Sequence, residues 1–323
     1  MIFLLIIIIV VIFIYILRLQ LHKSQQLWNI VLFKKEKNES LFEFLDNNYS
    51  KQFTPRCKIR TNYHYITGYA DPFLFSYKGW LYLFYEEEHL NSPAWICGVR
   101  TKDLKHWEKI GVVLKEPFHL SFPFVFENEG QIYMLPETRQ KDAVILYKST
   151  GFPYNWESIE LLSGDKFVDS SVIKYENMWY LFTTVWYGEN NGLKIFVSEQ
   201  LEGGWQEHPR SPITEDITFS RCGGAVLSVK GKLFRPAQDC SAYYGENVVL
   251  YEITELTPTS YKEERIKGLI ENNNSWSIHG GHHFSTTEFK GQNIVAMDGI
   301  VDDNIVNNHT RKLFNYCHNK CAR

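Results

Sequence analysis

Short apolar stretches separated by polar turns recur along most of the chain. The first complete example consists of two such stretches around the turn Lys78-Gly79, with Asp71 in front and Glu86 behind. Four later segments repeat the pattern. We take Tyr82, in the second apolar stretch of the first repeat, as the reference residue. The equivalent residues of the other repeats are Tyr133, Tyr180, Phe234 and Ile294. They follow one another at spacings of 51, 47, 54 and 60 residues.

Each repeat predicts three or four short strands joined by tight turns. The first turn of each repeat falls at Lys78-Gly79, Glu129-Gly130, Glu176-Asn177, Gly231-Lys232 and Lys290-Gly291. Units of about four strands that return every ~50 residues are typical of a β-propeller. The pattern therefore predicts an all-β fold, a five-bladed β-propeller over residues 61–303. The fifth repeat is short of strands, so we expect residues 61–69 to complete it and close the ring.

The chain begins with an unbroken apolar run at residues 2–17. It is slightly shorter than the ~20 residues that span a bilayer, but no small-residue cleavage site follows it. We therefore expect an N-terminal transmembrane helix, a signal anchor at residues 1–18, then a stalk at 19–60 and, after the propeller, a tail at 304–323. Basic residues after the run favour a cytoplasmic propeller. Four Asn-x-Ser/Thr triplets and the chemistry described below favour a lumenal or extracellular one.

Composition narrows the function classes. Apolar residues make up 44% of the chain, enough for a packed core, and the net charge of −3 gives no basic surface for nucleic acid. Cys222 and Cys240 flank one predicted hairpin and could pair in an oxidising compartment. The cysteines as a set lack a zinc-binding spacing; they are Cys57, Cys97, Cys222, Cys240, Cys317 and Cys321.

Equivalent positions of the repeats form rings around the channel of a propeller. Eleven residues before the reference lie Asp71, Phe122, Asp169, Gly223 and His283. Four residues after it lie Glu86, Glu137, Thr184, Gln238 and Asp298, with Arg235 and Asp239 nearby. Acids that converge on one channel suit glycosidic chemistry. One carboxylate activates water or attacks the sugar, and a protonated one gives its proton to the leaving oxygen.

Other readings compete with a site. An Asp-Pro pair is a common turn device, and an acid after a strand is commonly a solvated loop residue; the recurrence in phase favours the site. Adjacent His282 and His283 on a strand would point to opposite faces, which favours one imidazole lining the channel over a shared metal ion. Trp186 and Tyr187 follow an apolar strand and are either a sugar-stacking platform or ordinary packing.

Several motifs carry a family resemblance. They are Tyr-Ala-Asp-Pro-Phe-Leu-Phe (69–75), Ser-Phe-Pro-Phe-Val-Phe-Glu (121–127), Tyr-Met-Leu-Pro-Glu-Thr (133–138), Phe-Val-Asp-Ser-Ser-Val (167–172), Leu-Phe-Arg-Pro-Ala-Gln-Asp-Cys-Ser (233–241) and Leu-Thr-Pro-Thr-Ser-Tyr (256–261). Over about residues 61 to 300, the chain resembles the propeller at the N-terminus of plant glucosamine inositolphosphorylceramide transferases and related bacterial proteins. That domain is similar in turn to five-bladed glycoside hydrolases of families 43, 32 and 68.

The resemblance implies roles for three acids. Asp71 matches the base or nucleophile of the first blade, and Asp169 matches the orienting carboxylate that sets pKa values in the site. The general acid has no clean match; Glu137 fits by position, with Glu86 as the rival. The plant proteins carry a further C-terminal glycosyltransferase domain, which the resemblance over residues 61 to 300 does not include.

These observations predict a membrane-anchored, carbohydrate-active protein that acts on a glycan or glycolipid by glycosyl transfer. The alternative is a non-catalytic glycan-binding module that presents substrate to a partner glycosyltransferase. No metal or other cofactor is expected. The residues expected to bind substrate are Glu86, Trp186, Arg235, Asp239, His283 and Asp298.

Overall fold

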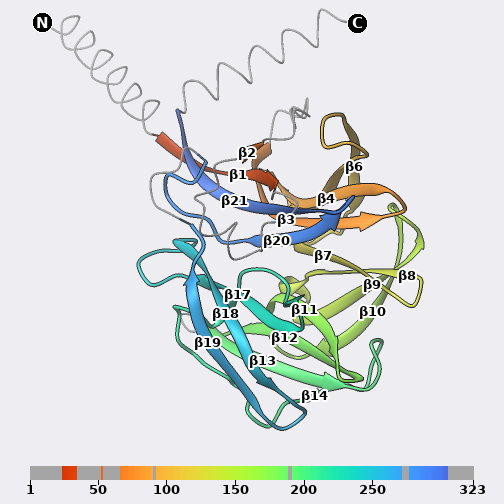
Figure 1. The fold of residues 1–323 in the computed structure, drawn as a ribbon, viewed down its shortest axis with the longest axis vertical. Coiled ribbons are helices and arrows are strands. Elements are labelled where there is room, and N and C mark those ends of the chain that lie inside the picture. Colours follow the sequence, from red (N-terminus) through yellow and green to blue (C-terminus); the bar gives the residue numbers. More distant parts are fainter. Residues whose placement is uncertain are drawn as a thin grey trace, which may run out of the picture.

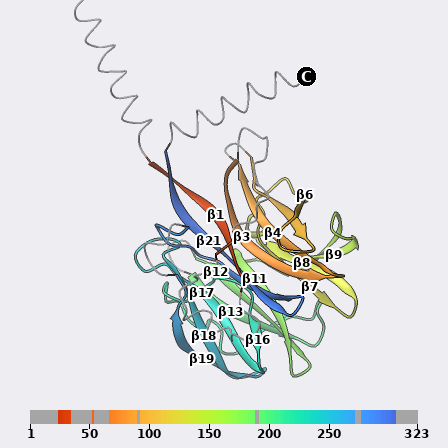
Figure 2. The same ribbon diagram turned by 45° about the horizontal axis from the view of Figure 1, so that its top comes forward.

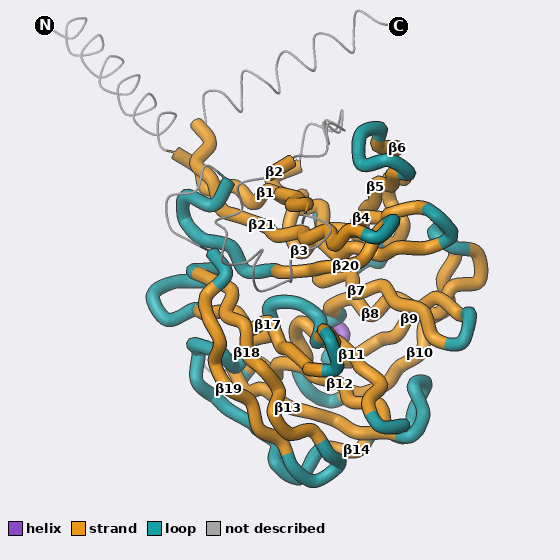
Figure 3. The backbone as a smooth tube through the Cα atoms, viewed as in Figure 1, coloured by secondary structure: helices purple, strands orange, loops and turns teal. Residues whose placement is uncertain are grey.

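The computed structural model describes residues 24–34, 52–53, 66–89, 92–187, 191–270 and 276–304. These residues form 21 strands in five antiparallel sheets, arranged as blades around a central axis (Figure 1). The described part of the chain contains a single helical turn, η1 (Arg139–Lys141), among the strands (Figure 3). The predicted all-β, five-bladed propeller is confirmed.

Four blades follow the order of the chain. Blade one consists of β3 (Ile66–Tyr77), β4 (Trp80–His89), β5 (Trp95–Thr101) and β6 (Trp107–Leu114). Blade two consists of β7 (Ser121–Asn128), β8 (Gln131–Glu137), β9 (Ala143–Gly151) and β10 (Asn155–Ser163). Blade three consists of β11 (Phe167–Tyr175), β12 (Met178–Trp186), β13 (Asn191–Ser198) and β14 (Gln206–Glu207). Blade four consists of β15 (Arg221–Cys222), β16 (Leu227–Val229), β17 (Lys232–Asp239), β18 (Asn247–Leu256) and β19 (Tyr261–Gly268).

Blade five joins the two ends of the described chain. Its sheet runs in the order β2 (Gln52–Phe53), β1 (Ser24–Lys34), β21 (Gln292–Asn304) and β20 (Phe284–Phe289). Strand β1 pairs with β21 over all eleven of its residues, and both ribbon views place the two strands side by side (Figures 1 and 2). The ring is thus closed by hydrogen bonds between segments that are far apart in sequence.

The closing segment differs from the predicted one. Residues 61–69 were expected to complete blade five, but the described part of that range, from Ile66, belongs to β3 of blade one. The closing strand is β1, which lies within the range expected to be a stalk. The reason is apolar burial. Val31, Leu32 and Phe33 are at most 1% exposed, so this short run gains more from packing in the ring than from solvent.

Positive backbone φ angles fix the hairpin turns of the inner strands. Lys78 and Gly79 have φ of 46° and 77°, as the two central residues of a type I′ turn require. In blade four the pair with positive φ is Lys230 and Gly231, one residue earlier than predicted. Glycine takes this conformation without steric cost, which explains why it recurs in these turns.

The disulfide between Cys222 and Cys240 and the N-terminal transmembrane helix are two further predictions from the sequence. Cys222 and Cys240 are free thiols, so the disulfide between them is absent from the structure. No helix among the described residues is long and apolar enough to cross a membrane. The apolar run at residues 2–17 lies outside the described ranges, as do residues 305–323 and the cysteines at positions 57, 317 and 321.

Truncation of a buried side chain in β1 tests the closure. We expect Phe33→Ala to lower the free energy of unfolding by about 3–5 kcal/mol, because Phe33 is fully buried and packs against Trp276. The measurement is chemical denaturation of the full chain in detergent. The control is Tyr154→Ala at a side chain that is 56% exposed, with an expected change within about 0.5 kcal/mol. Equal effects of the two substitutions would show that β1 does not close the ring.

Candidate active site

The innermost strands of blades one, two and three carry a β-bulge at the same place. In β3 the register with β4 shifts between Ala70 and Phe73, and β7 and β11 shift in the same way. The φ angles in the bulges are 52° at Asp71, 49° at Phe122 and 52° at Asp169. Bulges redirect side chains. These three residues are among the five positions that lie eleven residues before the reference residue of each repeat. The sequence repeat therefore located a feature of the backbone.

Asp71 forms hydrogen bonds with residues of blades two and five. Its Oδ2 accepts a hydrogen bond from the Phe122 backbone N–H (3.0 Å), and its own N–H donates to Asp298 Oδ2 (3.2 Å). Its Oδ1 lies 3.4 Å from His283 Nδ1 and 3.8 Å from His282 Nδ1. Asp298 in turn accepts both histidine backbone N–H groups through Oδ1, and its Oδ2 lies 2.6 Å from His282 Nδ1.

This network favours an ionised Asp71. Burial alone would raise the pKa of Asp71, but the contact with His283, the charge of His282 and the Phe122 N–H together hold it well below its usual value. Burial would lower the pKa of His282, but Asp298, with help from Asp71, raises it to about 9. At neutral pH an imidazolium therefore lies against two carboxylates. Nε2 of His283 is buried and has no hydrogen-bond partner among the described residues.

Asp169 is paired with blade four. Its Oδ2 accepts from Arg221 Nε at 2.7 Å and from Gln238 Nε2 at 3.2 Å. The same Gln238 amide donates to the Cys222 carbonyl at 2.9 Å, which fixes its orientation. Burial would lower the pKa of Arg221, but Asp169 keeps it well above its usual value. Asp169 is thus held by a permanent cation.

Glu86 and Glu137, which lie four residues after the reference residue of their repeats, have raised pKa values. Burial raises the pKa of Glu86 well above its usual value, and the negative charges of Asp71 and Glu88 add to the effect. Burial and then Asp169 raise the pKa of Glu137 to about 8, although Arg221 and Arg139 oppose the shift. Glu137, with a pKa of about 8, is therefore largely protonated near pH 7. The acids at this end of the channel, which we call the acid-bearing end, are Asp71, Glu86, Glu137, Asp169 and Asp298.

His119 links Glu86 to solvent. Its Nε2 lies 3.1 Å from Glu86 Oε1, and its side chain is 35% exposed. Sequence reasoning missed His119 and Arg221 because neither lies at a ring position. Only the approach of neighbouring blades brings them to the acids.

Two residues predicted to bind substrate have other partners. Arg235 is fully buried and forms a two-point ion pair with Glu263, at 2.8 Å from Nε and 2.6 Å from Nη2. The structure therefore assigns it to the packing of blade four. Asp239 accepts the backbone N–H of Ser241 at 3.0 Å, so its carboxylate caps the turn after β17. His283 and Asp298 do belong to the acid cluster.

Trp186 and Tyr187 line a hollow beside the acid-bearing end. The hollow has a volume of about 1070 Å³, and η1 and the segment between β10 and β11 form its other walls. Arg139 stacks on the Trp186 ring at 4.1 Å and also lies 3.8 Å from Glu137. The predicted sugar platform is thus connected to a ring acid through one side chain.

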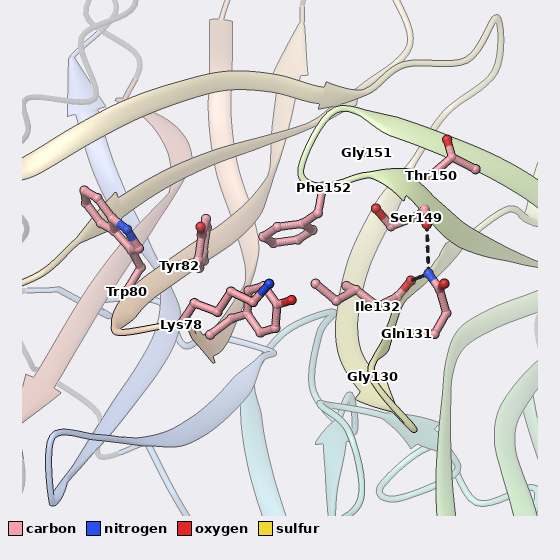
Figure 4. A pocket seen from close by; sticks show the side chains of 11 residues that line it. Lys78, Trp80, Tyr82, Gly130, Gln131, Ile132, Ser149, Thr150, Gly151 and Phe152 are labelled. Atoms are coloured by element: carbon pink, nitrogen blue, oxygen red, sulfur yellow. Dashed lines mark hydrogen bonds between the residues drawn. The ribbon is translucent and has the colours of Figure 1, made fainter.

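A second hollow lies at the opposite end of the blades. It has a volume of about 520 Å³ and is lined by the inner turns of blades one and two, including Lys78 and Gly130, with Trp80, Tyr82 and Phe152 around it (Figure 4). On one wall, Gln131 of β8 donates to the Ser149 carbonyl of β9 at 2.8 Å. None of its lining residues carries a carboxyl group, so it lacks the paired acids of the other end.

Asp71, His282 and Asp298 are also a group that could hold a metal ion. Each offers one ligand atom, and these atoms lie within 4.8 Å of one another. Two carboxylates with a neutral imidazole suit a divalent cation, whereas a protonated His282 supplies positive charge itself. The proton of His282 and a cation are therefore alternative counter-charges for the same two acids. His283, the other histidine of the predicted pair, is outside this group.

The fold has relatives among solved structures. The catalytic domain of a family 62 α-L-arabinofuranosidase from Coprinopsis cinerea superposes with a TM-score of 0.54 at 11% identity, covering 72% of this chain and 91% of that one. A family 117 glycoside hydrolase from Zobellia galactanivorans superposes with a TM-score of 0.51 at 12% identity, covering 73% and 84%. At such identities the likeness concerns the fold alone. By its architecture, the protein is a β-propeller that shares its fold with these two structures.

Sequence comparison identifies the family. The family model described as "Glucosamine inositolphosphorylceramide transferase 1, N-terminal" matches residues 56–300. The protein of that name from Oryza sativa subsp. japonica is 36% identical over 257 residues, and the one from Arabidopsis thaliana is 32% identical over 243. The chain belongs to this family, as its motifs indicated. The matches cover 75% and 71% of this chain but only 34% and 32% of these relatives, so it spans about a third of their length.

The raised pKa of Glu137 predicts an unusual pH dependence of stability. A carboxyl group with a folded-state pKa of about 8 favours folding fully below its ordinary pKa of 4.5, and this contribution is lost as the pH rises through 8. Glu137→Gln keeps the shape but cannot ionise. We therefore expect the variant to be more stable than the wild type at pH 9, by on the order of 4–5 kcal/mol, and equal to it near pH 4.5.

Chemical denaturation across pH 4.5 to 9 measures this difference. Glu157→Gln, at an exposed position of β10, is the matched control and should follow the wild type throughout. A Glu137→Gln variant that tracks the wild type at every pH would mean that Glu137 is ionised in the folded protein.

Proposed function

We propose that the protein acts on a glycan or glycolipid by glycosyl transfer, either to water or to an acceptor hydroxyl. The observation that carries the proposal is the division of charge at the acid-bearing end. Asp71 has a lowered pKa, whereas Glu137 and Glu86 have raised ones. Carboxyl groups pushed apart in this way provide a base and an acid at the same pH.

The proposed roles follow from protonation states. Asp71 accepts a proton from water or from the acceptor hydroxyl, or attacks the anomeric carbon itself. As the bond to the leaving oxygen breaks, the protonated glutamic acid gives its proton to that oxygen. Asp169, held by Arg221 and Gln238, orients the site and sets the pKa of Glu137 through its charge.

Glu137 is our first choice for the acid, because Arg139 connects it to the hollow that contains Trp186. Glu86 is the second choice, and two contacts support it. It is the cross-strand partner of Ala70, next to Asp71, and half-buried His119 can return a proton to it from solvent. The two candidates can be separated experimentally because they have different neighbours.

The substrate proposal draws on the relatives. They are named glucosamine inositolphosphorylceramide transferases, so we infer that this chain acts on the sugar-bearing head group of a related glycolipid. The exposed Trp186 and Tyr187 are suited to stack on a sugar ring. We further infer that residues 2–17 anchor the protein in a membrane, with the propeller on the lumenal or extracellular side. We also propose that the propeller works together with a partner glycosyltransferase.

The alternative function is binding without catalysis. It is favoured by the pairing of Asp71 with two imidazoles and of Asp169 with Arg221. Carboxylates with such partners are also suited to a rigid, polar binding surface. In this case the propeller would present a glycan to the partner enzyme.

Substitution of Asp71 separates the two functions. With the full chain and a panel of glycolipids, we expect Asp71→Asn to lower turnover by about 10²–10⁴-fold, because the base is lost while shape and burial are kept. Glycan binding should persist. Unchanged turnover in Asp71→Asn would remove the catalytic assignment, and binding without turnover in the wild type would support the alternative.

The identity of the acid is read from pH profiles. Turnover by the wild type should fall above about pH 8, where Glu137 loses its proton. Glu137→Gln should abolish this limb together with most of the activity, whereas Glu157→Gln should retain both. If Glu86→Gln has that effect and Glu137→Gln does not, Glu86 is the acid.

A further inference from the structure

Exposed apolar and aromatic side chains are unevenly distributed over the propeller. Of the nine large ones among the described residues, six lie in segments at the acid-bearing end, and Tyr154 lies at the opposite end. The six, between 36% and 47% exposed, are Trp186, Tyr187, Ile217, Tyr243, Tyr244 and Ile278. Isolated exposed apolar residues are ordinary, but a concentration at one end indicates a contact surface.

The four members on blades four and five form what we call the aromatic rim: Ile217, Tyr243, Tyr244 and Ile278. Tyr243 and Tyr244 lie in the loop between the paired strand ends Asp239 and Asn247. The Ile217 carbonyl accepts the N–H of Cys240 at the base of the same loop. Ile278 is held at this end because the N–H of its neighbour His279 donates to the Ile300 carbonyl, two residues beyond Asp298.

The chain also enters the propeller from this end. Strand β1 starts at Ser24, which pairs with Asn304, six residues past Asp298 and thus about 20 Å beyond it along the strand. Four residues later, Trp28 stacks on His282 at 3.9 Å and contacts the Tyr244 ring edge-on at 6.0 Å. Tyr244 of the aromatic rim is therefore packed against the strand that leads in from the N-terminal segment.

The sequence before Ser24 limits where this end can lie. The apolar run at residues 2–17 is followed by only six residues, 18–23. A chain of that length bridges at most about 25 Å. If the run is embedded in a bilayer, the acid-bearing end cannot be turned to the far side of the propeller without losing the β1–β21 pairing.

We propose that the acid-bearing end of the channel faces the membrane, with the aromatic rim in the interfacial layer of the lipids. Tyr243 suits this layer because its ring is apolar and its hydroxyl is polar. Exposed Glu215 and Asp216 lie beside Ile217, so attraction to anionic lipid does not supply the contact. The surface fits zwitterionic phospholipid.

The inference rests on residues 2–17 acting as an anchor and goes beyond the proposed chemistry. It gives the site access to head groups in the plane of the bilayer. It also predicts that Tyr154, in the turn between β9 and β10 at the opposite end, points away from the lipid.

Fluorescence quenching in vesicles tests the orientation. The full chain, with Cys57, Cys240, Cys317 and Cys321 replaced by serine, is labelled with an NBD fluorophore at Tyr243→Cys or at Tyr154→Cys. Cys97 and Cys222 are buried and remain. Each variant is reconstituted into phosphatidylcholine vesicles that contain spin-labelled phosphatidylcholine. We expect several-fold stronger quenching at position 243 than at position 154, and Ile278→Cys should behave like position 243.

Two results would overturn the inference: equal or reversed quenching at the two ends, or failure of the full chain to float with the vesicles. The chemistry is tested separately by adding Asp71→Asn to the labelled chain. This substitution should change turnover and leave the quenching pattern unaltered. A chain with the expected quenching but no turnover would contradict the proposed function and leave the orientation standing.

Discussion

The burial of five carboxyl groups at one end of the channel is the constraint on which the site depends. An unpaired carboxylate in such surroundings is costly, so each acid must find a counter-charge or keep its proton. Asp71 and Asp298 share His282, and Asp169 has Arg221. Glu86 and Glu137 are left with weaker or partly exposed cations, and their raised pKa values are the consequence. The contrast between the lowered pKa of Asp71 and the raised pKa values of Glu86 and Glu137 therefore follows from the number and position of buried cations.

The closure of the ring supports this balance. Strand β1 does more than complete blade five, because its Trp28 stacks on the His282 imidazole and limits the positions that ring can take. The bulges in β3 and β11 have a similar role for Asp71 and Asp169. The charge pattern is thus set by backbone features spread over all the blades, and a local change in one blade would be felt at the acids through the shared hydrogen bonds.

Much of the fold and part of the site could be predicted from sequence, for a physical reason. Blades are stacked copies, so residues in phase along the chain meet around the axis, which located Asp71, Glu137 and Asp169. The position of a residue within its repeat carries no information about partners that come from loops or neighbouring blades. Arg221 and His119 were missed for this reason. This position also cannot separate residues that face the channel from those inside a blade, as Arg235 illustrates. The closing strand was missed because β1 belongs to no complete repeat.

The ion pair between Arg221 and Asp169 affects how readily Glu137 can release its proton. Burial and the charge of Asp169 both push the pKa of Glu137 upward, and Arg221 is the first of the cations that oppose them. A general acid is most effective when its pKa is close to the working pH, since it must hold its proton and still release it. Without Arg221 the proton would be held too tightly. A pure binding surface has no need for this adjustment, whereas an acid catalyst at neutral pH depends on it. The Arg221–Asp169 ion pair is therefore consistent with a catalytic role for Glu137.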